Sequence, residues 1–220
     1  MIRGAIFDAD GTLLDSTDFW RGVGESYLRS VGCVPEEDLD EALKPLTLEQ
    51  AADYCRTRYG IQRTAEEIMD GMRGIIERFY RTEVRPKPGV QEFLQKLRAR
   101  GVGICVATLT DRPLIETALD RCGIRAYISA VFDCADAGRG KEDPAVYRAA
   151  LRHLGTRRED TVVFEDALYA VRTAKRDGFR VAAVYDRHES GQAEIRDLAD
   201  LYLTDFQDTG AFWRFASTLG

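Results

Sequence analysis

From Gly89 onward, short apolar stretches alternate with amphipathic helical patterns. This alternation is typical of βαβ units, in which crossover helices join parallel strands. The strands that we expect in this part of the chain lie at residues 102–107, 130–132, 161–164, 180–184 and 201–203. Another buried strand is expected near the amino end, at residues 2–7. The pattern predicts an α/β fold with a three-layer, Rossmann-like core around a parallel sheet.

The segment at residues 16–82 interrupts this alternation. It contains no β-branched run typical of a strand, and helix signals dominate it. Two capping boxes fit the segment, one at residues 47–50 and one at residues 64–67. A helical block between the first strand and the rest of the core predicts an inserted α-helical cap domain, with the core domain at residues 1–15 and 83–220.

Composition excludes several classes of protein. With 37 acidic and 31 basic residues the net charge is -6, and the arginines are scattered among acids, so we expect no nucleic acid partner. No apolar run approaches the ~20 residues of a membrane helix. The first residues lead directly into a strand, so we expect neither a signal peptide nor a membrane partner, and we place the chain in the cytoplasm. The five cysteines show no CxxC spacing and indicate neither a disulfide framework nor a thiolate metal site.

Polar side chains follow the predicted strands at the points where those strands end. The first strand runs directly into the sequence DADGT at residues 8–12, which contributes two carboxylates, Asp8 and Asp10. The other candidates are Thr108 and Thr110 after the second strand, Lys141 at the start of the helix that follows the third strand, and Glu165 with Asp166 after the fourth strand. Because the carboxyl ends of parallel strands border one crevice, we expect these side chains to lie close together.

This mixture of side chains is typical of phosphoryl transfer. The carboxylates offer hard oxygen ligands to Mg²⁺, whereas Thr108 and Lys141 offer a hydroxyl donor and a positive charge to phosphate oxygens. Each group also has a plainer structural explanation. The acids of residues 8–12 could be solvated groups of a turn, Lys141 could be a surface charge, and Asp166 could cap the following helix. Only the joint pattern favours a functional site.

The motifs resemble those of the haloacid dehalogenase superfamily, in its phosphatase and phosphomutase branch with a small helical cap of the β-phosphoglucomutase type. They are DxDGTLLDS at residues 8–16, VAT at 106–108, GKxxP at 140–144 and VFED at 163–166. The resemblance covers nearly the whole chain. It implies that Asp8 attacks phosphorus and forms an aspartyl-phosphate, while Asp10 protonates the leaving oxygen and then deprotonates the hydrolytic water.

The resemblance also implies how the other site residues act. Asp8, the backbone carbonyl of Asp10 and Asp166 would bind Mg²⁺, with Glu165 nearby or bridged by water. Thr108 and Lys141 would hold the phosphoryl group. Gly11 and Thr12 would shape the nucleophile loop and contribute to substrate binding.

Departures from the β-phosphoglucomutase pattern bear on the substrate. Those enzymes carry a cap-hinge histidine where this chain has Trp20, and a cap arginine that grips a distal phosphate where it has Leu48. Without that anchor a bisphosphate intermediate would be hard to retain, so we expect a phosphatase acting on a small phosphorylated metabolite. Trp20 would offer a flat apolar wall to a substrate ring.

Two alternatives stay open at this point. One is a hexose phosphomutase of the β-phosphoglucomutase type, and the other is a non-catalytic binding protein on the same fold. The acid at Asp10 disfavours the dehalogenases and phosphonoacetaldehyde hydrolases of the superfamily, because their reactions need no such proton shuttle. Nothing in the sequence indicates an oligomeric state.

Overall fold

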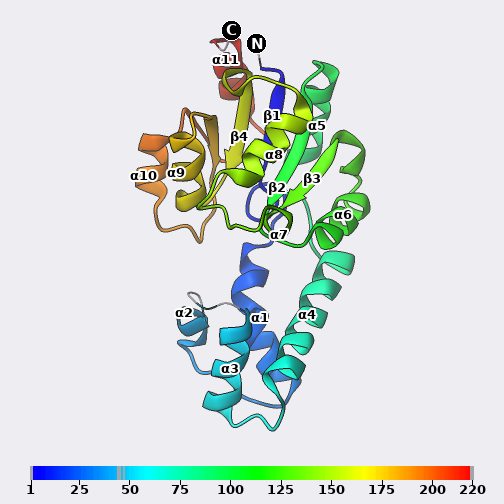
Figure 1. Ribbon diagram of the computed structural model, residues 1–220, viewed down its shortest axis with the longest axis vertical. Coiled ribbons are helices and arrows are strands. Elements are labelled where there is room, and N and C mark those ends of the chain that lie inside the picture. The colour runs from blue at the N-terminus through cyan, green and yellow to red at the C-terminus, as the bar shows by residue number, and fades with distance from the viewer. Residues whose placement is uncertain (1, 44–45, 47, 219–220) are drawn as a thin grey trace. The chain divides into compact units, whose positions relative to one another are not determined.

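The computed structural model describes residues 2–43, 46 and 48–218 of the chain, which divides into two compact units (Figure 1). The sheet unit comprises Met1–Asp15 and Val84–Gly220, and the helical unit comprises Ser16–Glu83. The roles of catalytic core and cap that the sequence suggests for residues 1–15 with 83–220 and for residues 16–82 stay predictions.

A six-stranded parallel sheet forms the centre of the sheet unit in the described part of the chain. In chain order its strands are β1 (Gly4–Phe7), β2 (Gly103–Thr108), β3 (Ala130–Asp133), β4 (Thr161–Glu165), β5 (Arg180–Val184) and β6 (Leu201–Leu203). Their order across the sheet is β3-β2-β1-β4-β5-β6. The register places Phe7 beside Val106 on one side and Phe164 on the other. Because the order reverses at β1, its carboxyl end lies at the point where α/β sheets bind ligands.

Helices cover both faces of this sheet. They are α5 (Val90–Ala99), α6 (Arg112–Arg121), α7 (Cys134–Ala137), α8 (Ala145–Leu154), α9 (Leu168–Arg176), α10 (Gln192–Leu198) and α11 (Gly210–Thr218), with 3-10 turns η1 (Arg125–Tyr127) and η2 (Arg158–Asp160). One face of the sheet packs against α8, α9 and α10 through a buried, mainly aliphatic cluster that includes Ile6 and Val163. The predicted three-layer α/β fold is confirmed.

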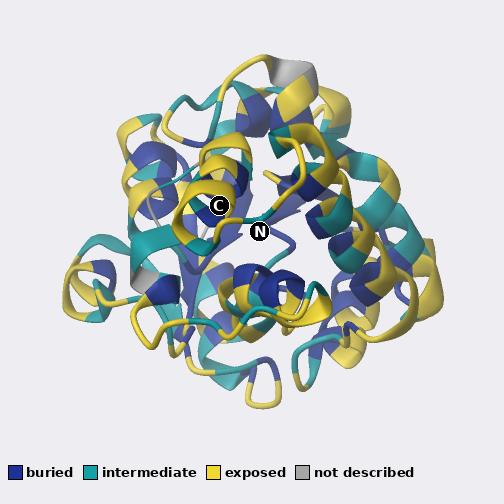
Figure 2. Ribbon diagram, turned by 90° about the horizontal axis from the view of Figure 1, so that it is seen from below, coloured by how far each residue is buried: buried dark blue, intermediate teal, exposed yellow. Residues whose placement is uncertain are grey.

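Successive side chains of a strand point to opposite faces of the sheet. The second face of this sheet carries aromatic side chains. The rings of Phe7 and Phe164 stack with their centroids 4.1 Å apart. Phe93 of α5 and Phe212 of α11 pack over them, with centroids 4.9 Å apart. Truncating such a buried ring to alanine costs about 3–5 kcal/mol. The central strands β1 and β4 are accordingly buried throughout, whereas the helices carry exposed residues on their outer sides (Figure 2).

Three helices of the sheet unit are absent from the sequence-based prediction, namely α7, which has only four residues, α10 and α11. Helix α10 buries only Ile195, and α11 buries Phe212 and Ala216. A helix with so few buried residues has no apolar stripe of helical period from which it could be recognised. The strands, by contrast, begin and end within about two residues of their predicted positions.

The helical unit consists of α1 (Thr17–Ser30), α2 (Leu39–Leu43), α3 (Leu48–Tyr59) and α4 (Ala65–Thr82). The capping box at the start of α4 is confirmed, because Glu67 N donates to Thr64 Oγ1 at 3.1 Å and Thr64 N donates to Glu67 Oε2 at 2.8 Å. The predicted box at residues 47–50 includes Thr47, which lies outside the described residues. At Gly71 a Cβ atom would lie 2.5 Å from Tyr27 Cε2, so this glycine lets α4 approach α1 closely.

The five cysteines are free thiols. Within the described ranges, no helix is both long and apolar enough to cross a bilayer.

Candidate active site

The predicted site residues of the sheet unit lie along one edge of the sheet. Asp8 follows β1, Thr108 ends β2, and Glu165 ends β4 with Asp166 directly after it. Because β2 and β4 both pair with β1, these residues come from three adjacent strands. Lys141 reaches the same edge from the loop before α8, as its hydrogen bonds to Asp8 and Glu165 show.

Three buried carboxylates form the centre of the site. Oxygen atoms of Asp8, Glu165 and Asp166 all lie within 4.8 Å of one another. Two carboxylates ~4 Å apart repel each other by roughly 4 kcal/mol at an effective dielectric constant of about 20. This exceeds the ~1 kcal/mol that a typical hydrogen bond contributes. The cluster therefore needs positive charge, and its hard oxygen donors suit a divalent cation.

Lys141 supplies part of that charge. Its side chain is only 2% exposed, and its Nζ donates to Asp8 Oδ1 and, at 2.7 Å, to Glu165 Oε1. Burial alone would lower the pKa of Lys141, but the Asp8 and Glu165 carboxylates outweigh burial and raise the pKa above its ordinary value. The Lys141 side chain is therefore an ammonium at neutral pH.

Asp8 and Asp166 of the cluster hold their protons more tightly than ordinary carboxyl groups, because their pKa values are raised. Burial raises the pKa of Asp8 well above its usual range; Lys141 opposes this shift, and the neighbouring acids add to it. Burial and the adjacent Glu165 raise the pKa of Asp166 to about 7, although the hydrogen bond from Thr12 opposes the rise. Full ionisation of the site depends on the positive charge available to it.

One carboxylate oxygen of Glu165 accepts hydrogen bonds, and the other has no hydrogen-bond partner among the residues that the structure describes. Its Oε1 accepts hydrogen bonds from Lys141 Nζ at 2.7 Å and from Tyr147 Oη at 2.6 Å. Its Oε2 is buried and has no hydrogen-bond partner among the described residues. A buried carboxylate oxygen without a partner is costly, and a bound cation would satisfy it.

The loop after β1 is a tight turn that orients the side chain of Thr12. Leu13 N and Leu14 N both donate to Ala9 O, at 2.9 and 2.8 Å. Gly11 has a φ of 83°, a left-handed conformation that only glycine adopts without strain. The hydroxyl of Thr12 is fully buried and donates to Asp166 Oδ1 at 2.7 Å. The Thr12 side chain is thus hydrogen-bonded to an acid of the cluster.

Asp10 lies beside the cluster, and a hydrogen bond from the loop after β2 orients its side chain. Thr110 Oγ1 donates to Asp10 Oδ2 at 2.8 Å, and Thr110 N donates to Thr108 Oγ1 at 3.0 Å. Thr108 at the end of β2 and Thr110 just after it therefore form a chain of hydrogen bonds that fixes the Asp10 carboxylate. The Asp10 side chain does not belong to the group of three carboxylates, and the predicted metal contact of Asp10 was through its backbone carbonyl.

The structure adds residues that the sequence analysis does not single out as site residues. Tyr147 lies on the buried face of α8, where a tyrosine is expected to be ordinary core, so no sequence signal indicates its bond to Glu165. Lys87 Nζ donates to Tyr185 O at 2.9 Å and to Asp186 Oδ2 at 3.2 Å. Asp186 is a buried acid just beyond the end of β5, a position that could have identified it.

Trp20 belongs to the helical unit. The residue is 38% exposed, and its Nε1 donates to Tyr80 Oη at 3.0 Å. This bond joins α1 to α4 within the unit. The contact of Trp20 with a substrate stays a prediction.

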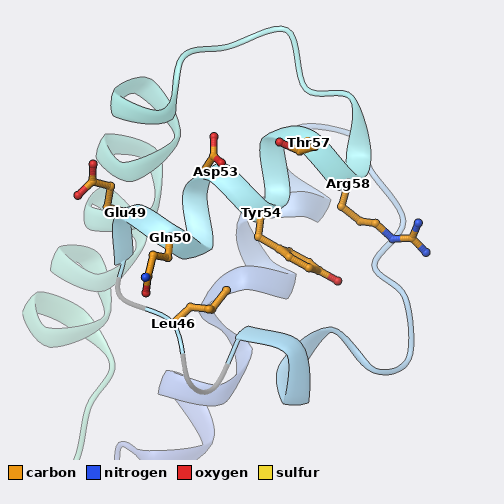
Figure 3. Close-up of a pocket in the computed structure, with 7 residues that line it drawn as sticks. All are labelled: Leu46, Glu49, Gln50, Asp53, Tyr54, Thr57 and Arg58. Carbon is orange, nitrogen blue, oxygen red and sulfur yellow. The ribbon is translucent and has the colours of Figure 1, made fainter.

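The helical unit also has a surface pocket on α3 (Figure 3). It is lined by Leu46, Glu49, Gln50, Asp53, Tyr54, Thr57 and Arg58. Its acids and its single arginine are of opposite charge, and Arg58 already pairs with Glu36 at 2.7 Å. The pocket therefore lacks the free positive charge that a phosphate group requires.

Comparison with known proteins gives a consistent result. The model of the haloacid dehalogenase-like hydrolase family matches residues 5–184. Protein CbbY of Cereibacter sphaeroides is 31% identical over 93% of this chain and 98% of its own length. A phosphorylated carbohydrates phosphatase of Thermotoga maritima is 26% identical over 87% of this chain and 89% of its own.

A similar fold is also present among solved structures. A Thermotoga maritima protein that bears the name β-phosphoglucomutase superposes with a TM-score of 0.86 at 22% identity, covering 97% of this chain and 99% of that one. At this identity the likeness concerns the fold. Together with the family match, it confirms the resemblance that the four motifs predict.

Proposed function

The chain belongs to the haloacid dehalogenase-like hydrolase family and is a phosphoric monoester hydrolase, and from this premise we propose that it is a Mg²⁺-dependent phosphatase. It removes the phosphate group of a small phosphorylated metabolite through an aspartyl-phosphate on Asp8. The observation that carries the proposal is the buried cluster at the end of β1, where Lys141 bonds Asp8 and two further acids lie within 4.8 Å.

The residues of the cluster fit a Mg²⁺ ion. Asp8, Asp166 and Glu165 supply hard oxygen donors, and the unpartnered Glu165 Oε2 is the atom that most needs a cation. The ion, when bound, neutralises charge on the phosphate oxygens and polarises the phosphorus that is attacked. Its presence would also favour the ionised forms of Asp8 and Asp166, whose pKa values burial raises.

Asp8 acts as the nucleophile. An ionised carboxylate needs no activating base, and Lys141 favours the ionised form. One carboxylate oxygen of Asp8 forms a bond to phosphorus while the bond from phosphorus to the leaving oxygen breaks. Lys141 and Thr108 hold the transferred group through its oxygens, and the fixed position of Lys141 means that little reorganisation is needed during transfer.

Asp10 moves the protons of both half-reactions. It donates a proton to the leaving oxygen, and it then removes a proton from the water that attacks the aspartyl-phosphate. Inorganic phosphate is released and the Asp8 carboxylate is restored. The bond from Thr110 to Asp10 Oδ2 supports this role, because a general acid must be held in one orientation to the leaving oxygen.

The substrate is a small molecule with a single phosphate group. The Thermotoga maritima relative, named for phosphorylated carbohydrates, supports a sugar phosphate or a similar metabolite. We assign the helical unit the role of a cap that excludes water during transfer, with Trp20 as its contact to the substrate. We also place the protein in the cytoplasm, for which its free cysteines are typical.

A β-phosphoglucomutase activity is the second candidate, and the fold likeness to a protein of that name favours it. Against it, Trp20 Nε1 is engaged with Tyr80, and Leu48 offers no charge to a second phosphate group. A phosphatase needs no such anchor.

Phosphate release from a panel of phosphorylated metabolites, with Mg²⁺ and with a chelator, tests the proposal. We expect Mg²⁺-dependent release from at least one sugar phosphate or related metabolite. With β-glucose 1-phosphate, accumulation of glucose 6-phosphate instead of inorganic phosphate would establish the mutase. Absence of release from the whole panel and from a generic aryl phosphate would refute catalysis and favour the binding protein.

A further inference from the structure

Tyr147 is a fully buried side chain of α8 that the proposed mechanism does not use. Its hydroxyl donates to Glu165 Oε1 at 2.6 Å, and its ring centroid lies 5.9 Å from Lys141 Nζ and 6.2 Å from that of Phe179. A tyrosine whose only task is to fill the core needs no hydroxyl. Here the hydroxyl donates a hydrogen bond to an acid of the cluster.

The bond to Tyr147 determines which atom Glu165 can offer. Oε1 accepts from two donors, Lys141 and Tyr147, and both are buried. The carboxylate therefore cannot rotate about its terminal bond without breaking two hydrogen bonds in a region of low dielectric. Oε2 has no hydrogen-bond partner in the described part of the chain and is the oxygen left for a cation.

The adjacent acid is held in the same way. Thr12 Oγ1 donates to Asp166 Oδ1 at 2.7 Å, again from a fully buried hydroxyl. Each of the two acids at the end of β4 thus has its own hydroxyl donor, one from the loop after β1 and one from α8. Outer groups that hydrogen-bond ligating carboxylates set their orientation, and their loss typically reduces metal affinity or activity by about 10–100-fold.

We propose that Tyr147 is a positioning residue that locks the Glu165 carboxylate so that Oε2 faces the divalent cation. The inference rests on the proposed Mg²⁺ site. Tyr147 acts through Glu165 and not on the phosphate group. Its hydroxyl also leaves Lys141 free to share its charge between Asp8 and Glu165, because Lys141 is not the sole donor to the Glu165 carboxylate.

The test is Mg²⁺ binding by isothermal titration calorimetry, a measurement that does not depend on turnover. Tyr147→Phe keeps the ring and removes only the hydroxyl, so its thermal unfolding should be cooperative like that of the wild type. We expect its dissociation constant for Mg²⁺ to rise about 10-fold. Raising the Mg²⁺ concentration should restore most of kcat, because the catalytic groups are intact.

Tyr202→Phe is the matched control. Tyr202 also has a hydrogen-bonded hydroxyl, which donates to Gln192 Oε1 at 2.6 Å, but it lies on β6 outside the cluster. Its Mg²⁺ affinity should stay within twofold of the wild type. Equal affinities for Tyr147→Phe and the wild type would overturn the inference alone. A wild type that binds no Mg²⁺ would overturn the proposed metal site and this inference with it.

A double-mutant cycle with Glu165→Gln tests the route of the effect, and it holds even if Tyr147→Phe loses some stability. If Tyr147 acts through the Glu165 carboxylate, adding Tyr147→Phe to Glu165→Gln should weaken Mg²⁺ binding by less than twofold. Losses that multiply in the double variant would show that Tyr147 acts independently of Glu165, which contradicts the proposal.

Discussion

In the sheet unit, Lys141 pairs with Asp8 and Glu165 through side chains that are at most 11% exposed. In the helical unit, the pair Arg29–Glu25 joins side chains that are 62% and 51% exposed, with an N···O distance of 2.6 Å. Similar pairs recur on the same unit at Arg73–Asp70 and Arg81–Glu77. Their contact distances resemble those of the catalytic edge, but their surroundings do not.

Burial decides what each pair can do. In water the attraction between two opposite charges is screened and is offset by the entropy cost of fixing two long side chains. In a buried cluster the same charges are strongly coupled, and removing one leaves the others without compensation. We therefore expect substitutions in the buried cluster to change chemistry, ion binding and pH dependence, and substitutions of the exposed pairs to change little.

Asp8→Asn removes the proposed nucleophile and should have the largest effect on kcat. An amide cannot form the aspartyl-phosphate, so kcat should fall by at least about 10⁴-fold. The fold should persist, because asparagine has the same shape and the buried carboxyl is itself costly. Single-turnover assays of phosphate release, with circular dichroism as the check on folding, measure both. A variant that retains a substantial part of the rate would reject Asp8 as the nucleophile.

Lys141→Ala removes the positive charge but keeps the nucleophile. If Lys141 contacts the transferred phosphoryl oxygens, kcat should fall by roughly 150-fold or more, which corresponds to about 3 kcal/mol of transition-state stabilisation. Lys175→Ala is a suitable control, because Lys175 forms a partly buried pair with Asp200 at 2.6 Å on the same unit. Its kcat should stay within twofold. A change in KM alone for Lys141→Ala would contradict the proposed role.

The same contrast explains what could be predicted from the sequence. Asp8, Thr108 and the acids Glu165 and Asp166 were predictable as neighbours, since each ends or follows a strand and parallel strands bring these ends together. Lys141 lies before a helix, and only its place in the motif pattern identified it. The hydrogen bond from Tyr147 to Glu165 was not predictable. An apolar helix face with a period of about 3.6 residues gives no information about the hydrogen-bond partner of a single hydroxyl group on it.

Thr12 illustrates the same limit at shorter range. The sequence places it in the nucleophile loop and suggests contact with substrate, but the direction of its hydroxyl depends on how the loop closes. The turn at Gly11, with φ of 83°, directs this hydroxyl to Asp166, which follows β4 and lies 154 residues away along the chain. Spacing along a strand is local information, whereas the partners of buried hydroxyl groups are set by long-range packing.

The raised pKa of Asp166, about 7, predicts how the metal-free protein responds to pH. The folded state keeps the proton on Asp166 up to about pH 7, whereas the unfolded chain releases it near its ordinary value of 3.8. The folded state therefore binds more protons between these values, and the free energy of unfolding falls as pH rises through this window. With chelator present, Tm should be several degrees lower at pH 7.5 than at pH 5.5.

Two comparisons check that Asp166 is the source of this pH dependence. Asp166→Asn should show a smaller change of Tm between the two pH values, because the buried ionisable group is gone. Added Mg²⁺ should raise Tm of the wild type more at pH 7.5 than at pH 5.5, since binding requires the ionised carboxylates. A metal-free Tm that rises with pH, and does so equally in Asp166→Asn, would contradict the assignment.

The smallest effect is expected on the surface of the helical unit. Arg29→Ala with Glu25→Ala removes both partners of an exposed ion pair one helical turn apart. Alanine favours helix as well as either residue it replaces, and exposed pairs of this spacing contribute little. We expect Tm to change by less than about 2 °C and kcat for phosphate release by less than twofold. High salt should not alter the difference from the wild type. A large loss of activity in this variant would show that the exposed charges of the helical unit take part in the reaction, and burial alone would then not separate the two kinds of ion pair.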